Sequence, residues 1–75
     1  MNKDRRNRLR EARRLLVRAQ NIIEEVKTEE EIAFDNLSDG LQQTMRGETM
    51  EENVDIMEDA IEKIEEVVDL LDEIE

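Results

Sequence analysis

Residues 50–71, MEENVDIMEDAIEKIEEVVDLL, decide the fold of this 75-residue chain. Apolar side chains return along this stretch at alternating steps of four and three residues, and acidic side chains fill most of the positions between them. This spacing is the heptad repeat of an α-helix that packs along one face against another helix. The repeating apolar residues are Met50, Val54, Met57, Ile61, Ile64, Val68 and Leu71. The sequence therefore predicts a long helix over about residues 50–74.

The first half of the chain has the same spacing. Its repeating positions are Leu9, Ala12, Leu16, Ala19, Ile23, Val26, Glu30, Ala33 and Leu37, of which Glu30 alone is polar. A buried carboxylate costs free energy unless it is paired, so Glu30, which faces Met57, either lies near an open end of the helix pair or specifies its register. This pattern predicts a first helix over about residues 4–35.

The linker, residues 36–49, contains both glycines of the chain. Asp39 followed by Gln42 predicts a cap and a short helical turn near residues 39–45. Thr49 followed by Glu52 predicts a capping box at the start of the second long helix, after a break at Gly47. The linker is long enough for the two helices to fold back on each other.

Antiparallel pairing of the helices matches each apolar layer with an apolar layer. The matched pairs are Leu16 with Leu71, Ala19 with Val68, Ile23 with Ile64 and Val26 with Ile61, and their residue numbers always sum to 87. In this register three further pairs flank the seam, namely Arg13 with Asp72, Lys27 with Glu58, and Gln20 with Glu65. Two of these pairs join opposite charges and the third joins an amide to a carboxylate, which supports a helical hairpin.

A second apolar row lies beside the seam. It consists of Leu15 and Ile22 in the first helix and Ala60, Val67 and Ile74 in the second. One hairpin leaves this row in water, which forgoes roughly 1.5–3 kcal/mol for each large side chain. The predicted fold is therefore an all-α, single-domain antiparallel hairpin over residues 1–75 that assembles as a homodimeric four-helix bundle or a higher oligomer.

The composition excludes most chemistry. The chain has no cysteine, histidine, proline, tryptophan or tyrosine. Disulfides are impossible, and nucleophilic catalysis lacks both a base and an activated nucleophile, so the sequence predicts neither an enzyme nor a cofactor. The longest apolar run is three residues, far short of a membrane span, and no signal-peptide pattern opens the chain. These features predict a cytoplasmic protein that does not enter membranes.

Two carboxylate patterns in the sequence resemble metal sites. Residues 35–40 resemble the start of a calcium loop, but Leu37 occupies the third ligand position and Arg46 the twelfth. Residues 51–55, EENVD, and residues 66–69, EVVD, resemble the EExxE and ExxD carboxylates of all-α, magnesium-binding nucleotide pyrophosphatases. In the predicted register they lie on the solvent side, so no metal site is expected.

The charge of the chain is distributed unevenly. The chain has 11 basic and 22 acidic residues, a net charge of −11, yet residues 1–18 have a local balance of +6. Four arginines at four-residue steps form what we call the arginine ridge, which consists of Arg6, Arg10, Arg14 and Arg18. Such a ridge suits phosphate or carboxylate recognition, but it can equally neutralise the acidic end of the second helix. Because the first helix outreaches the second, Lys3, Arg5, Arg6 and Arg8 are expected to overhang without partners.

The second helix carries what we call the acidic stripe. It consists of Glu51, Asp55, Glu58, Glu62, Glu65, Asp69 and Asp72. A continuous negative stripe can imitate a nucleic acid toward a basic protein, and it is also common on ordinary acidic coiled coils. The balance of −17 over residues 19–75 argues against binding of duplex DNA.

The hairpin tip is a second candidate contact. Phe34, Asp35, Asn36, Gln42, Gln43 and Arg46, together with Glu30, can form a small polar pocket there. The alternative is structural: Phe34, Leu37, Leu41 and Met45 plug the end of the bundle, and Asp35 and Asn36 cap the helix.

The linker also carries a resemblance. Residues 31–42, EIAFDNLSDGLQ, followed by Met50-Glu51-Glu52 and acidic heptads, resemble a group of small uncharacterised proteins of phages and mobile elements. Those proteins join two helices by a Phe/Tyr-Asp-Asn-Leu/Met-Pro segment that ends in Leu-Gln, whereas this chain has Ser38 in place of the proline. The similarity covers about residues 20–75. It implies a phage or mobile-element setting, in which short non-enzymatic proteins act as host-defence antagonists by binding a host component in the host cytoplasm.

Three functions follow as hypotheses. The first is an oligomeric binding protein that blocks a host protein or an anionic, nucleotide-like ligand through the N-terminal arginines and the hairpin tip. The second is a nucleic-acid mimic that binds a basic host protein through the acidic stripe. The third is a structural assembly subunit.

Overall fold

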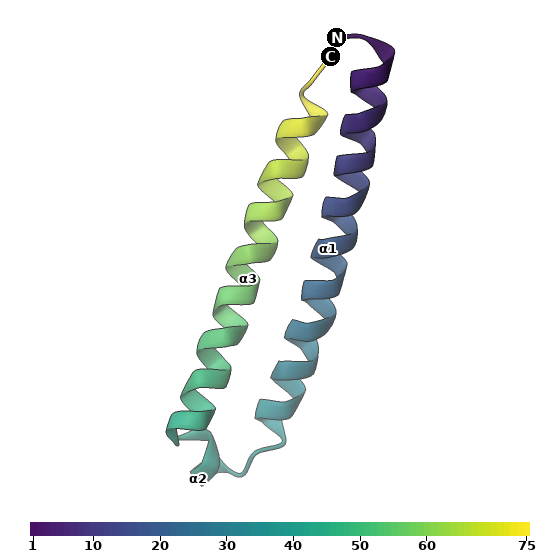
Figure 1. Cartoon of the computed structure of the whole chain (residues 1–75). Helices are drawn as coiled ribbons and strands as arrows, with labels where there is room; N and C mark the ends of the chain where they lie inside the picture. Colours follow the sequence, from purple (N-terminus) through teal and green to yellow (C-terminus); the bar gives the residue numbers. More distant parts are fainter.

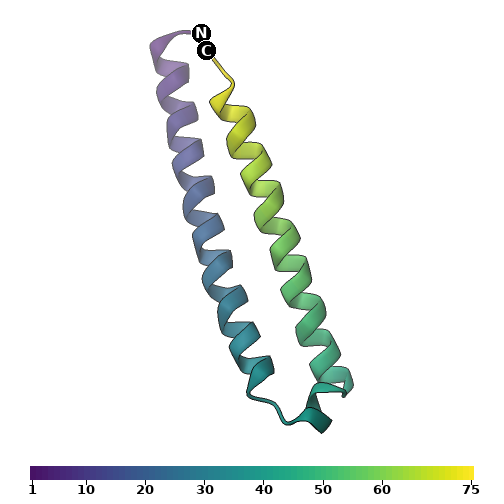
Figure 2. The same cartoon turned by 180° about the vertical axis from the view of Figure 1, so that it is seen from behind.

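The computed structural model describes residues 1–75 and consists of helices and their connections only. Helix α1 spans Lys3–Asp35, the short helix α2 spans Asp39–Gln42, and α3 spans Met45–Asp72. Helices α1 and α3 lie antiparallel, with α2 at the tip and both termini at the opposite end (Figures 1 and 2). The result is a rod of 58 × 15 × 12 Å. The predicted antiparallel hairpin is confirmed.

Helix α1 is long because nothing in its sequence interrupts it. It starts at an Asn2 cap, whose side-chain oxygen accepts a hydrogen bond from the backbone N–H of Arg5 at 2.8 Å. Its 33 residues include no proline or glycine, and it ends at Asp35; the next residue, Asn36, caps it and donates its N–H to the carbonyls of Ile32 and Phe34. The expected range of about residues 4–35 therefore agrees with the structure to within one residue at its start.

The start of α3 differs from the prediction. The helix begins at Met45, five residues before the expected position, because Thr44 already provides a cap: its Oγ1 accepts from the N–H of Gly47 at 3.4 Å. Thr49 is inside the helix and donates its hydroxyl to the carbonyl of Met45 at 2.9 Å. The capping box at Thr49 and the chain break at Gly47 were wrong, since a glycine at an ordinary helical φ does not stop a helix that is already capped.

The tip is closed by backbone contacts and by Gln42. The predicted short turn exists as α2, but its cap is Ser38 and not Asp39, because the Ser38 hydroxyl accepts from the N–H of Leu41 at 3.4 Å. The side-chain amide of Gln42 donates to the carbonyls of Phe34 at 3.1 Å and Leu37 at 3.2 Å. Gly47 is buried directly against the Gln42 backbone. The tip is therefore a packed corner that joins the end of α1 to the start of α3.

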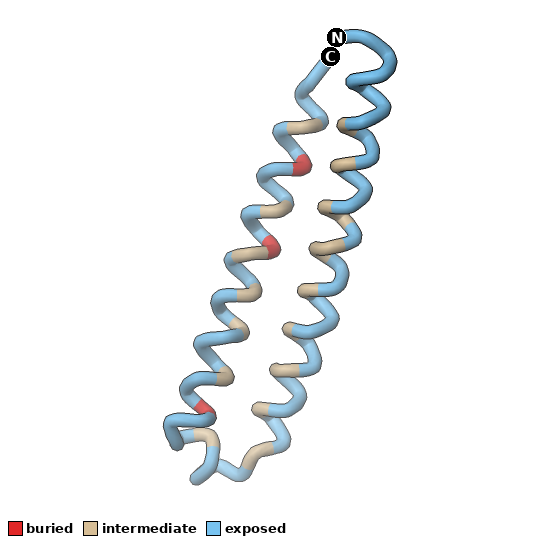
Figure 3. Tube along the Cα trace, viewed as in Figure 1, coloured by how far each residue is buried: buried red, intermediate tan, exposed pale blue.

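The core is a single seam between the two long helices. In α3 the seam includes Ile61 and Val68, each only 8% exposed, and its remaining members are half-buried. In Figure 3 the buried and half-buried residues of each long helix lie on the side that faces the other helix. Every apolar heptad position predicted in α3 lies in this seam, from Met50 to Leu71.

In α1 the seam rotates toward the tip. Lys27 and Phe34 are half-buried there, whereas Val26 and Ala33, one residue earlier in each case, are exposed. The physical reason is that a straight helix has 3.6 residues per turn, so a strict seven-residue repeat drifts by about 20° per heptad unless the helices supercoil. The predicted Val26–Ile61 layer was therefore wrong. Glu30 is half-buried at the seam, as expected.

Two of the three predicted flanking pairs are confirmed. Arg13 contacts Asp72, and the Gln20 amide donates to Glu65 at 2.9 Å. Lys27 instead pairs with Glu31 on its own helix, at 3.5 Å between Nζ and Oε1. Lys27 lies in the seam and pairs with Glu31, four residues further along α1, so the predicted pair between Lys27 and Glu58 is not formed.

Candidate functional site

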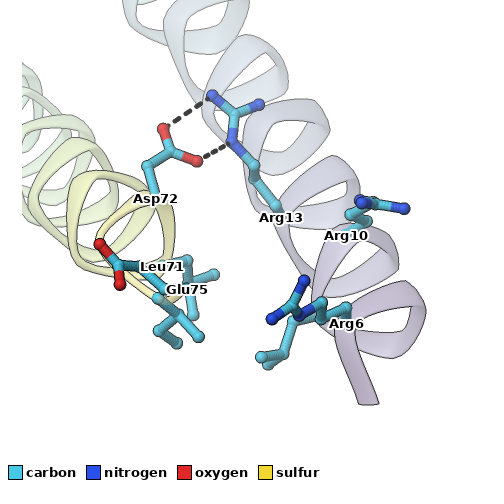
Figure 4. Close-up of a pocket in the computed structure, with 8 residues that line it drawn as sticks. Arg6, Arg10, Arg13, Leu71, Asp72 and Glu75 are labelled. Atoms are coloured by element: carbon cyan, nitrogen blue, oxygen red, sulfur yellow. Dashed lines mark hydrogen bonds and ion pairs between the residues drawn. The ribbon is translucent and has the colours of Figure 1, made fainter. Parts of the chain in front are cut away.

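An open groove of about 270 Å³ lies at the end of the hairpin that holds the termini (Figure 4). It is lined by Arg6, Leu9, Arg10, Arg13, Leu71, Asp72, Ile74 and Glu75. Apolar side chains from both helices thus lie beside three arginines. We call this feature the terminal groove.

One of these arginines, Arg13, forms an ion pair that joins the two long helices. The Arg13 guanidinium donates twice to the Asp72 carboxylate, from Nε to Oδ1 at 2.7 Å and from Nη2 to Oδ2 at 3.2 Å, as the dashed lines of Figure 4 show. This bidentate contact raises the pKa of Arg13 and lowers the pKa of Asp72. Arg13 therefore neutralises the acidic end of α3 and leaves little charge for a ligand.

Only one member of the arginine ridge, Arg14, is ion-paired within the chain. Arg14 donates to Glu11 on its own helix, with Nη2–Oε1 at 2.6 Å and Nε–Oε2 at 3.0 Å, and this contact lowers the pKa of Glu11. Arg10 donates only to the neutral Asn7 side chain, at 3.0 Å. Arg6 and Arg18 form no ion pair. In Figure 4 the Arg6 side chain reaches toward α3, whereas Arg10 points away from it.

The expected overhang of basic residues is found in part. Arg8 pairs with Asp4 at 3.8 Å, and both side chains are largely exposed. Glu75, in the short segment after α3, lines the terminal groove together with Arg6, so Arg6 still lies beside an acidic part of the chain. Lys3 and Arg5 have no ion pair and lie outside the groove. The unpaired positive charge at this end is therefore carried by Lys3, Arg5, Arg6 and Arg10.

The tip contains a cleft of a different character. It measures about 240 Å³ and is lined by Glu31, Phe34, Asp35, Glu51, Val54 and Asp55. Phe34 and Asp35 are thus brought together as expected, but Asn36, Gln42 and Arg46 do not line this cleft: Asn36 caps α1 and Gln42 fastens the corner. Arg46 and Gln43 are exposed. The tip cleft is acidic, and of the predicted mixed polar pocket it contains only Phe34 and Asp35.

Of the four residues expected to form an apolar plug at the tip, two are half-buried. Phe34 and Leu37 are half-buried, whereas Leu41 and Met45 are exposed. Met45 lies at the first position of α3, where its side chain does not reach the seam.

The terminal groove and the tip cleft lie at opposite ends of the 58 Å rod. A nucleotide-sized ligand cannot touch both, since it is much shorter than the rod. The two predicted contact regions therefore serve one partner only if that partner is a macromolecule.

The acidic stripe is exposed over its whole length. Two of its members have polar partners in the chain, because Asp72 binds Arg13 and Glu65 accepts from Gln20. The nearby Lys63 pairs with Asp59 and Glu66, which lie outside the stripe, at 3.7 and 3.8 Å. No three carboxylates approach closely enough to hold a metal ion. Neither long helix contains an apolar stretch sufficient to cross a lipid bilayer.

The predicted second apolar row lies outside the hairpin core. Leu15 and Ile22 are each 50% exposed, Val67 and Ile74 are exposed to a similar degree, and Ala60 is half-buried. Sequence reasoning missed three further members of this surface, Val26, Ile56 and Leu70, of which Ile56 and Leu70 are 66% and 60% exposed. Their signal was present in the sequence, because Ile56 and Leu70 continue the row at helical spacing. We call the whole surface the apolar flank.

No protein-family model, curated protein or solved structure matches this chain.

Proposed function

We propose that this chain is a non-enzymatic helical hairpin that self-associates through the apolar flank and acts by binding an anionic partner at the terminal groove. The observation that carries the proposal is the set of unpaired basic side chains at that groove, where Arg6 and Arg10 lie beside Leu9 and Leu71. Guanidinium groups suit carboxylates and phosphates, since they offer paired donors in a fixed plane. The apolar residues between them would receive the non-polar part of the partner.

The setting we propose is a phage or mobile element, as the linker resemblance implies, with a host component as the blocked partner. Because the tip cleft is acidic and lies at the other end of the 58 Å rod, the contact that we propose for an anionic partner is confined to the terminal groove. Binding and blocking require no catalytic group. The host cytoplasm is the proposed location.

Native mass spectrometry of the chain, purified from the cell that encodes it, tests this proposal. We expect a mass that is a multiple of 8.9 kDa together with a retained partner. The double variant Arg6→Glu/Arg10→Glu should lose the partner by at least about tenfold, since each lost charge-assisted contact is worth about 1.5–3 kcal/mol. Arg46→Glu, a single Arg→Glu change at an exposed site outside the terminal groove, is the control and should retain the partner. Equal retention by all three proteins would exclude the terminal groove.

A second candidate function is a nucleic-acid mimic that binds a basic host protein. The observation that favours it is that Glu51, Asp55 and Glu58 form no ion pair within the chain. Their negative charges are therefore free to bind a basic protein. The triple variant Glu51→Lys/Asp55→Lys/Glu58→Lys should abolish this activity and spare binding at the terminal groove. If both sets of changes are tolerated in the native cell, the chain is a structural assembly subunit.

A further inference from the structure

The exposed apolar residues of α3 form a second heptad row. This row consists of Ile56, Ala60, Lys63, Val67 and Leu70 on α3 and of Ile74 just beyond the end of the helix at Asp72, at steps of four, three, four, three and four residues. Four of its members are large apolar side chains that the hairpin leaves exposed. Such regular spacing is typical of a seam that packs against a further helix.

Helix α1 has a row with the same spacing. It consists of Leu15, Ala19, Ile22, Val26, Glu29 and Ala33, again at steps of four, three, four, three and four. Val26 belongs to this row because the rotation of the hairpin seam turned it outward. Each helix therefore presents two seams, one used within the hairpin and a second whose large apolar side chains stay exposed, while its small members Ala19 and Ala60 are half-buried at the border between the two.

The unused seams have the direction that a bundle needs. At about 100° per residue, the second row of each helix is turned by roughly 90–110° from its hairpin seam. Adjacent contacts of a helix in a square four-helix bundle are separated by about a right angle. Since α1 and α3 are antiparallel and their second rows are offset in the same rotational sense along each chain, both rows lie on one face of the hairpin.

We propose that the occupant of this face is a second copy of the chain, in which α1 of each copy packs antiparallel against α3 of the other about a two-fold axis parallel to the rod. The inference rests on the proposed self-association and specifies its geometry. The facing pairs are Leu15 with Ile74, Ala19 with Leu70, Ile22 with Val67, Val26 with Lys63, Glu29 with Ala60, and Ala33 with Ile56. Their residue numbers sum to 89, whereas those of the facing pairs within the hairpin sum to 87. This difference of two residues means that facing side chains differ in height along the rod by only about 3 Å.

The polar residues of the two rows are complementary in this arrangement. Lys63 faces Val26 of the second copy, and Glu29 of that copy lies in the next layer, within reach of the long lysine side chain. On the edge of the same contact, Arg18 lies opposite Glu73 of the second copy, and neither residue forms an ion pair in the hairpin. An ion pair at a seam position fixes the register of a helix bundle.

The net charge of each helix selects this arrangement over the opposite stacking. Helix α1 carries +1 and α3 carries −9 over their helical residues. Stacking with the tips at opposite ends would place α1 on α1 and α3 on α3, so that the two strongly acidic helices would touch. In the proposed bundle the two α3 helices lie on a diagonal, and every neighbour of an α3 helix is an α1 helix.

Two measurements on the full chain test this geometry. The first attaches a spin label at Gly40→Cys, because an added Cβ at Gly40 meets open space and the chain has no other cysteine. The two labels should lie within about 30 Å of each other, since neighbouring helices of a bundle are about 8–10 Å apart. A separation near the length of the rod would overturn the proposed orientation.

The second measurement exchanges the charges of the seam pair. Lys63→Glu and Glu29→Lys should each weaken the dimer at least fivefold in sedimentation equilibrium. The double variant should regain most of the wild-type affinity, because the two symmetric copies of the pair between residues 63 and 29 are then restored with their charges exchanged. Lys3→Glu, the same change as Lys63→Glu at an exposed site outside the seam, is the control and should leave the dimer unchanged. A dimer without this rescue, or an oligomer larger than two, would overturn the inference while leaving self-association intact. A wild-type monomer at micromolar concentration would overturn self-association itself.

Discussion

At Gly47, the packing of the tip predicts that an alanine substitution destabilises the protein, which is the opposite of what helix propensity predicts. Alanine is preferred over glycine in a helix by about 1 kcal/mol, so Gly47→Ala would ordinarily stabilise α3. Here the added Cβ would lie 2.7 Å from the carbonyl carbon and 2.9 Å from the Cα of Gln42, and closer still to its carbonyl oxygen. These are backbone atoms, and they cannot move without opening the tip. Overpacking of this kind costs about 1–3 kcal/mol, and the rigid surroundings favour the upper end.

The expected net result is a loss of about 2 kcal/mol in the free energy of unfolding, or roughly 8–16 °C in Tm for a chain of this size. Gly40→Ala is the matched control. Its Cβ would meet open space, so the same substitution should leave Tm unchanged or raise it. Thermal unfolding followed by circular dichroism, at one fixed protein concentration for all variants, measures both changes. If Gly47→Ala were as stable as Gly40→Ala, the close contact between Gly47 and Gln42 would not exist in solution.

Two further predictions concern the side chains that fasten the hairpin. Gln42→Ala should lower the free energy of unfolding by about 1–2 kcal/mol, because two carbonyls lose a donor, whereas Gln43→Ala at the exposed neighbouring position should have little effect in the same urea titration. The Arg13–Asp72 contact should contribute to stability above the ordinary pKa of the carboxyl, 3.8, and this contribution should be lost as the pH falls through the lowered folded-state pKa. Asp72→Asn should therefore flatten the acid limb of the stability profile, and an unchanged limb would show that the contact is not formed in solution.

The regular parts of the fold could be predicted from the sequence because they depend on spacing alone. The apolar heptads of α3 fixed which side chains would face α1, and the charges at Arg13 and Asp72 supported the antiparallel register. The short turn at the tip was also expected, since Asp39 followed by Gln42 suits a helical turn, although the residue that caps it is Ser38 and not Asp39.

The errors arose where two local signals compete. Thr44 and Thr49 can both cap a helix, and the earlier one prevails because its hydroxyl bonds to the Gly47 N–H while Gly47 packs on Gln42. That packing is a tertiary contact which no local pattern reveals. The outward turn of Val26 has another cause, because the heptad count assumes supercoiled helices and the drift of straight helices accumulates toward the tip.

The candidate site could be predicted only as a set of basic residues. Sequence alone does not determine which arginines are already neutralised, since Glu11 lies three residues before Arg14 and Asn7 three residues before Arg10, and both spacings suit a contact. The structure separates them, because Arg14 has a carboxylate partner and Arg10 has only a neutral amide. The acidic lining of the tip cleft was missed because it combines residues from α1 and α3.

Both ends of the chain emerge together, away from α2. In a bundle whose tips share one end, all four chain ends would gather at the other. A flexible tether of Gly and Ser residues could then link two copies head to tail into one polypeptide without crossing the rod. Such a tandem protein would hold its halves at millimolar effective concentration, and its melting temperature would no longer depend on dilution.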